Sequence, residues 1–266
     1  MTPPATASDA ARADLSDLTS PAPSSLPASR GELPAAVLWD LDGTLVDTEP
    51  IWIAAERELV AAHGGTWTHE DALTLVGNPL LTSAEILRER GVALPPEEIA
   101  AWLIERVNAQ VLANGPTWRP GARELLAQAR AAGIPQAIVT MSYHRQARVV
   151  ADALPPGTIG EIVSGDMVTN GKPHPEAYLR AAEVLGVEPR DCLAIEDSAT
   201  GARSALAAGT ATVVCPNVVP VPELPGLARV GTLAGADVRD LFAAGRAARA
   251  AAAVAGEATE PARERA

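Results

Sequence analysis

The chain has 266 residues, of which 47% are apolar and 20% charged, as is usual for a globular protein of one or two domains. Its net charge of -12 argues against nucleic acid or an anionic membrane as a partner, and no segment approaches the roughly 20 apolar residues that span a bilayer. The N-terminal sequence lacks a charged region followed by an apolar one, so secretion is not expected. We therefore expect a cytoplasmic protein whose two cysteines, Cys192 and Cys215, are buried free thiols.

Both ends of the chain differ in composition from the middle. Residues 1–33 are rich in Ala, Pro, Ser and Thr and contain almost no large apolar side chain. Such a segment cannot bury enough surface to offset the entropy lost on ordering, so we predict a disordered tail there. Residues 246–266 are Ala-rich with scattered Arg and Glu, and we expect them to extend a final helix and then to fray as a C-terminal tail.

Short apolar runs alternate with helical patterns through much of the remaining chain. The predicted strands are residues 35–39, 135–139, 161–163, 192–195 and 211–215, and the predicted helices are residues 121–132, 142–153, 175–185 and 200–208. Regular alternation of this kind is typical of a parallel sheet with helices on both faces. We therefore predict an α/β protein with a doubly wound, Rossmann-like parallel sheet, built from residues 34–50 and 119–245.

Residues 51–118 interrupt this alternation, because they show helical patterns and no convincing strand. One helix is expected to open at a capping box, Thr82 to Glu85, and another at Pro95 and Pro96. The insertion begins directly after the first predicted strand and the acidic segment that follows it. We therefore expect it to form an α-helical cap domain above that segment.

The acidic segment begins with Asp40-Leu41-Asp42-Gly43-Thr44 and continues to Glu49. A strand that ends in this sequence leaves strand geometry after the second acid. Both carboxylates can then lie at the carboxyl edge of the sheet, where open α/β folds bind ligands. Two carboxylates so close repel each other unless a cation lies between them or one holds a proton. An acidic turn after a strand is the alternative that these residues leave open.

Polar side chains also follow two later strands. Thr140 ends the second strand, where a hydroxyl and the following backbone N–H groups suit a phosphate oxygen, although a helix N-cap explains Thr140 equally well. Glu196 and Asp197 end the fourth predicted strand, and Gly201 would let the next turn approach them closely. Lys172 lies between these two strands in the sequence, within Gly-Lys-Pro-His-Pro, where the prolines hold it rigidly. A solvated lysine is the alternative there.

These four segments, in this order, resemble the signatures of the haloacid dehalogenase superfamily over roughly residues 34–240. The helical insertion resembles the cap of its phosphatase and β-phosphoglucomutase-like members. The resemblance implies that Asp40 is the nucleophile, which takes the phosphoryl group as an aspartyl-phosphate, and that Asp42 is the general acid and base. Members that cleave carbon–halogen bonds lack the second Asp, so Asp42 favours phosphoryl transfer.

The resemblance also assigns roles to the other segments. Thr140 and Lys172 complete the expected catalytic set, and the ammonium of Lys172 would neutralise the phosphoryl oxygens and the attacking carboxylate. Oxygen ligands suit Mg²⁺, so we expect Asp40, the backbone carbonyl of Asp42 and Asp197 to bind it, with Glu196 binding directly or through water. Asp166 is expected to orient Lys172 or to contact the residues behind the site. The expected substrate-binding residues are Gly43, Thr44, Glu49, Gly77, Asn78, Met141 and Ser142.

The expected function is a Mg²⁺-dependent phosphatase that hydrolyses a small phosphomonoester, such as a sugar or polyol phosphate. The alternative is a β-phosphoglucomutase-like phosphosugar mutase, which shares the four signatures and the cap. In those mutases an Arg of the cap grips the distal phosphate, whereas Leu80 takes its place here and Arg88 or Arg90 could compensate. A non-catalytic phospholigand-binding protein is disfavoured because no catalytic residue is missing. We expect a small phosphorylated metabolite as the partner, and a monomer or weak homo-oligomer.

Overall fold

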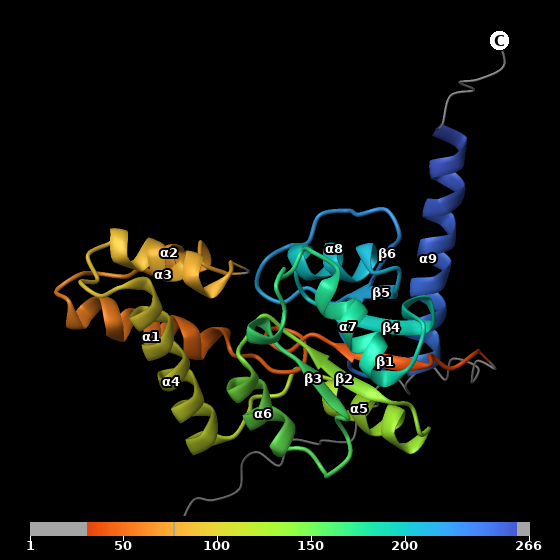
Figure 1. Ribbon diagram of the computed structural model, residues 1–266, viewed down its shortest axis with the longest axis horizontal. Helices are drawn as coiled ribbons and strands as arrows, with labels where there is room; N and C mark the ends of the chain where they lie inside the picture. Colours follow the sequence, from red (N-terminus) through yellow and green to blue (C-terminus); the bar gives the residue numbers. More distant parts are fainter. Residues whose placement is uncertain (1–30, 77, 260–266) are drawn as a thin grey trace, which may run out of the picture. The chain divides into compact units, whose positions relative to one another are not determined.

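The computed structural model describes residues 31–76 and 78–259. Within them, six parallel strands form one sheet in the order β3-β2-β1-β4-β5-β6 (Figure 1). The strands are β1 (Ala36–Trp39), β2 (Gln136–Val139), β3 (Glu161–Val163), β4 (Cys192–Glu196), β5 (Ala211–Val214) and β6 (Leu227–Arg229). The predicted parallel α/β sheet is confirmed. The sequence pattern missed β6, because this three-residue edge strand is only partly buried and has no apolar run.

Helices cover both faces of the sheet, as side chains along a strand alternate between them. On one face, α7 (Glu176–Leu185) and α8 (Ala199–Ala207) pack against a layer that includes Ala36 and Leu38 of β1. On the other face, Val37 and Trp39 of the same strand meet α5 (Ala122–Ala131), α6 (His144–Asp152) and α9 (Val238–Thr259). β1 is therefore buried on both faces, as expected for a central parallel strand.

The insertion is helical throughout its described residues. It contains α1 (Glu49–Ala62), α2 (His69–Leu73), α3 (Leu80–Glu89) and α4 (Pro96–Asn114), and α4 packs against both α1 and α3. The predicted capping box was wrong, because α3 begins two residues before Thr82, directly after Pro79. Pro79 has a fixed, non-helical backbone that marks the helix start instead. The capping box that does exist opens α2, where Thr68 and Asp71 exchange hydrogen bonds.

The C-terminal helix α9 reaches into the expected C-terminal tail and continues as one helix to Thr259. Arginines along it bind backbone carbonyls of other segments: Arg239 donates to Gly31 at 2.6 Å and Arg249 donates to Arg190 at 3.0 Å. An Ala-rich sequence has high helix propensity, and α9 also packs against β5 of the sheet. Residues 1–30 of the predicted N-terminal tail and residues 260–266 lie outside the described residues.

Two expectations from composition can be compared with the structure. Cys192 and Cys215 are buried free thiols, as predicted. None of the helices in the described part of the chain is long and apolar enough to cross a membrane.

Candidate active site

The four sequence segments meet at the carboxyl edge of the sheet, beside its central strand. β1 pairs with β2 on one side and with β4 on the other, so that Trp39 lies opposite both Ile138 and Ile195. Asp40, which follows β1 directly, is therefore a neighbour of the ends of β2 and β4. Parallel pairing thus brings together side chains more than 150 positions apart in the sequence, from Asp40 to Asp197.

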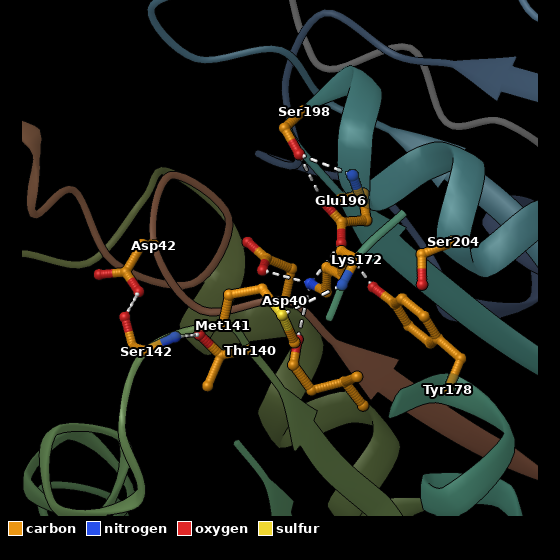
Figure 2. A network of polar contacts seen from close by, with 12 residues as sticks. Asp40, Asp42, Thr140, Met141, Ser142, Lys172, Tyr178, Glu196, Ser198 and Ser204 are labelled. Atoms are coloured by element: carbon orange, nitrogen blue, oxygen red, sulfur yellow. Dashed lines mark hydrogen bonds and ion pairs between the residues drawn. The ribbon is translucent and has the colours of Figure 1, made fainter. Parts of the chain in front are cut away.

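Lys172 is buried at the centre of the site, and it is the only lysine in the sequence. Its ammonium lies 2.7 Å from Asp40 Oδ1, 2.6 Å from Glu196 Oε1 and 2.9 Å from the carbonyl of Val139 (Figure 2). Burial by itself lowers the pKa of Lys172, but the charges of Asp40 and Glu196 outweigh burial and hold the pKa above its usual value. Lys172 therefore stays protonated at neutral pH. Its ammonium binds Asp40 through Oδ1 only, and Oδ2 of Asp40 is buried and has no hydrogen-bond partner in the described part of the chain.

Glu196 is fully buried, and its carboxylate is held from several sides. Besides Lys172, Tyr178 of α7 donates to Oε1 at 2.6 Å and Ser198 donates to Oε2 at 3.2 Å. Gly201 lies against this carboxylate, as the sequence predicted, because a Cβ built there would come 2.0 Å from Glu196 Oε1. Sequence reasoning missed Tyr178, since nothing local marks a tyrosine on a helix as facing an acid that lies 18 positions away.

Replacing Gly201 with Ala should therefore displace the Glu196 carboxylate and loosen its bond to Lys172. We expect a loss of stability of about 2 kcal/mol and a fall in turnover, because the new methyl group overlaps a buried side chain. Urea unfolding and phosphate release measure the two effects. Gly231→Ala is the matched control, since a Cβ at Gly231 meets nothing within 4 Å. Wild-type behaviour of Gly201→Ala would show that the carboxylate does not need this close approach.

The second acid, Asp42, is held by hydroxyl groups. Its Oδ1 accepts a hydrogen bond from Thr48 at 2.6 Å, and its Oδ2 accepts one from Ser142 at 2.5 Å. Gln146 lies 3.4 Å from Oδ1. Burial raises the pKa of Asp42, and the nearby charge of Asp40 raises it further, whereas these hydrogen bonds lower it only in part. Asp42 therefore retains a proton to higher pH than an ordinary aspartate does, which suits a proton donor.

Three carboxylates form a candidate metal centre. Asp40, Glu196 and Asp197 each offer an oxygen, and these oxygens lie within 4.8 Å of one another. Within the described residues, no hydrogen bond or ion pair reaches Asp197, and burial raises its pKa well above the usual value, as do the charges of Asp40 and Glu196. Gly43 has a φ of +85°, and a Cβ there would lie 2.1 Å from Asp197 Oδ2. An oxygen-only set with excess negative charge fits a hard cation such as Mg²⁺.

A cavity of about 640 Å³ lies between these residues and the cap helices. Of the expected substrate-binding residues, Glu49, Asn78, Met141 and Ser142 line it. Gly43 and Thr44 are buried and are not among its described lining residues, and Gly77 lies outside the described part of the chain.

Two residues lie in places that differ from the expectation. Thr140 is buried beside the cavity without lining it, and its hydroxyl accepts a hydrogen bond from the Ser142 N–H at 3.0 Å. Of the two roles expected for Asp166, a contact with Lys172 is not found among the described residues. Asp166 Oδ1 accepts hydrogen bonds from the Ser164 hydroxyl and the His144 N–H, and thereby holds the start of α6, the helix whose Gln146 contacts Asp42. Asp166 follows β3, a strand that does not pair with β1, so it lies away from the centre of the site.

Comparison with known proteins agrees with this geometry. Residues 34–209 match the family described as haloacid dehalogenase-like hydrolase. Protein CbbY of Rhodobacter capsulatus is 34% identical over 68% of this chain and 85% of its own length, and hexitol phosphatase A of Escherichia coli is 35% identical over 70% and 85%. A crystal structure of CbbY from Rhodobacter sphaeroides with xylulose-(1,5)bisphosphate superposes with a TM-score of 0.71, at 30% identity, over 79% of this chain and 99% of that one.

The chain therefore belongs to the haloacid dehalogenase-like hydrolase family. It is an enzyme of the group that contains the named phosphatases, and the predicted family and enzyme class are confirmed.

Proposed function

We propose that the chain is a Mg²⁺-dependent phosphatase that hydrolyses a small sugar or polyol phosphate through an aspartyl-phosphate on Asp40. One observation carries this proposal. Lys172 binds Asp40 through Oδ1 alone and leaves Oδ2 buried and without a partner, at the carboxyl end of the central strand and beside a cavity. A buried carboxylate oxygen that is kept free in this way suits a nucleophile.

The proposed reaction has two steps. Oδ2 of Asp40 attacks phosphorus, the bond from phosphorus to the alcohol oxygen breaks, and Asp42 gives its proton to the leaving oxygen. Water then attacks the phosphoryl group, Asp42 takes a proton from it, and the bond between Asp40 and phosphorus breaks to release inorganic phosphate. The raised pKa of Asp42 supports its role as proton donor in the first step.

The charge of the transferring phosphoryl group is neutralised from two sides. Lys172 supplies a fixed ammonium that hydrogen bonds keep in place. Mg²⁺, when bound, would act as a Lewis acid that stabilises the negative charge on the phosphoryl oxygens. Asp40, Asp197 and the backbone carbonyl of Asp42 would hold Mg²⁺, and Glu196 would support them directly or through water.

Charges along the cavity favour a monophosphate substrate and disfavour the mutase. Lys172 is the only cationic residue among the described lining residues, and Leu80 lines the cap side. Arg88 is paired with Glu85 at 2.8 Å and Arg90 with Asp71 at 3.0 Å, and neither lines the cavity. A second phosphate, such as that of the xylulose bisphosphate bound to CbbY, would find no cation there.

Metal removal tests the proposal. Wild-type protein should release phosphate from sugar phosphates in Mg²⁺, lose this activity in EDTA and recover it when Mg²⁺ is restored. Asp197→Ala should weaken Mg²⁺ activation at least about tenfold, because one of few ligands is lost. Asp152→Ala, an exposed acid at the end of α6, is the matched control.

Two outcomes would contradict the proposal. Full activity in the chelator would show that the carboxylates serve another purpose. Conversion of β-glucose 1-phosphate into glucose 6-phosphate faster than phosphate release, with a trace of β-glucose 1,6-bisphosphate, would favour the mutase.

A further inference from the structure

The cap contributes an acidic wall to the cavity. Glu49, Trp52 and Glu56 lie at positions i, i+3 and i+7 of α1, so their side chains share one face of that helix, and all three line the cavity. The wall from α3 is largely apolar, with Leu80 and Leu81. The catalytic chemistry proposed above uses neither glutamate.

Glu56 is an acid in the cavity wall with one carboxylate oxygen unpaired in the described part of the chain. The residue is only 6% exposed, and its Oε2 accepts a hydrogen bond from the Trp67 indole at 3.0 Å. No hydrogen bond or ion pair within the described residues reaches Oε1. Burial raises the pKa of Glu56 to about 7, although the Trp67 bond and the charge of Arg57, an exposed residue, lower it. Glu56 lines the cavity, so a ligand that carries a hydrogen-bond donor can pair with this oxygen.

Glu49 adds a second carboxyl group without a partner. Within the described residues, no hydrogen bond or ion pair reaches it. Burial raises its pKa to about 7, and the charges of Asp42, Glu56 and Asp47 raise it further. The two glutamates therefore repel each other electrostatically, and a hydrogen-bond donor placed between them would relieve that repulsion.

We infer that Glu49 and Glu56 form a subsite for the end of the substrate that is remote from the phosphate, and that this subsite requires hydrogen-bond donors and rejects anions. Glu56 is its specificity-determining residue. The donors are hydroxyl groups or an ammonium group, since both satisfy a carboxylate. The inference rests on the proposed phosphatase function, which supplies the position of the phosphate end beside Asp40 and Lys172.

The physical basis is the cost of unpaired polar groups. A substrate with hydroxyl or ammonium groups at its remote end pairs with the free Glu56 oxygen and with Glu49, and the ring of Trp52 offers an apolar surface between them. A remote carboxylate or phosphate would instead face two acids, and Lys172, the only cationic residue among the described lining residues, lies at the phosphate end. A site whose acceptors form hydrogen bonds with the donors of its substrate discriminates strongly against a ligand that lacks those donors.

The test compares four esters in wild-type enzyme with Mg²⁺: sorbitol 6-phosphate, glucosamine 6-phosphate, 6-phosphogluconate and phenyl phosphate. We expect kcat/KM for sorbitol 6-phosphate or glucosamine 6-phosphate to exceed that for 6-phosphogluconate at least about tenfold. Phosphate release from phenyl phosphate reports on the proposed function alone. If none of the four esters is hydrolysed, the phosphatase proposal fails. If phenyl phosphate is hydrolysed but kcat/KM is higher for 6-phosphogluconate than for sorbitol 6-phosphate and glucosamine 6-phosphate, the phosphatase proposal stands and this inference fails.

Two variants then separate charge from hydrogen bonding. Glu56→Leu should lower the ratio of kcat/KM for the donor-bearing ester to that for phenyl phosphate at least about tenfold. If the donors are hydroxyl groups, Glu56→Gln keeps an acceptor, and its kcat/KM ratio should fall much less than that of Glu56→Leu. If the donor is an ammonium group, the kcat/KM ratio should fall in both variants. Glu58→Gln, an exposed acid of α1 paired with Arg106, is the matched control. Ratios equal to the wild-type ratio in both variants would overturn the inference.

Melting temperatures show whether the variants fold. The pKa of Glu56 is raised in the folded state, so the folded protein binds more protons than the unfolded one between pH 4.5 and about 7, and wild-type stability falls as the pH rises through that window. Glu56→Gln keeps an acceptor for Trp67 and removes the ionisable group. Its melting temperature relative to wild type should therefore be higher at pH 8 than at pH 5. A relative decrease instead would contradict the buried, free acid on which the inference depends.

Discussion

Replacing Asp40 with Asn should abolish phosphate release while leaving the protein folded. We expect kcat to fall at least about 10⁴-fold, because an amide is a very poor nucleophile in the place of the carboxylate. The fold should survive, since Asn has nearly the same shape and its carbonyl oxygen can still accept the hydrogen bond of Lys172, which Asp40 Oδ1 accepts at 2.7 Å. Initial rates in saturating Mg²⁺ measure the loss.

The control for this variant is Asp191→Asn, an exposed acid just before β4. It should retain wild-type turnover, and both variants should melt within about 5 °C of the wild type. Mass spectrometry of acid-quenched enzyme should find a phosphoryl group on Asp40 in wild type and none in Asp40→Asn. Turnover by Asp40→Asn at more than a few per cent of the wild-type rate would remove Asp40 as the nucleophile.

Replacing Lys172 with Met should have the second largest effect, on both stability and turnover. Lys172 is 7% exposed, and it neutralises Asp40 and Glu196 at 2.7 and 2.6 Å. Methionine leaves two buried carboxylates without their cation, so we expect the free energy of unfolding to fall by about 3–5 kcal/mol. Turnover should fall about 10³-fold, because the fixed positive charge beside the phosphoryl group is lost.

A double variant identifies the cause of this instability. Lys172→Met with Glu196→Gln removes one of the two unpaired charges, so it should be more stable than Lys172→Met alone, as measured by urea unfolding without Mg²⁺. Turnover should not recover, because the ammonium is still absent. If the double variant is no more stable than the single one, the unpaired carboxylates are not the cause. Wild-type turnover in Lys172→Met would exclude Lys172 from the chemistry.

The core of the fold and the centre of the site could be predicted because their signals are local. Buried parallel strands have continuous apolar runs, and three of the predicted strands lead directly into polar residues of the site, namely Asp40, Thr140 and Glu196. Since parallel strands all end at one edge, strand order implied that Asp40 and Asp197 would meet, and the family resemblance implied that Lys172 would join them. Gly201 also marked one close approach to a carboxylate, whereas the approach of Gly43 to Asp197 was seen only in the structure.

By itself, then, the sequence determined the family, the parallel sheet, the helical cap and the four segments that meet at Asp40, because each of these depends on short-range pattern and on strand order. Only the tertiary structure showed that Tyr178 holds Glu196, that Gln146 reaches Asp42 and that Glu56 faces the cavity. These contacts depend on how each helix is rotated about its axis and where it packs. Packing of the whole core sets that rotation, and no local pattern encodes which polar residue of a helix will turn inward.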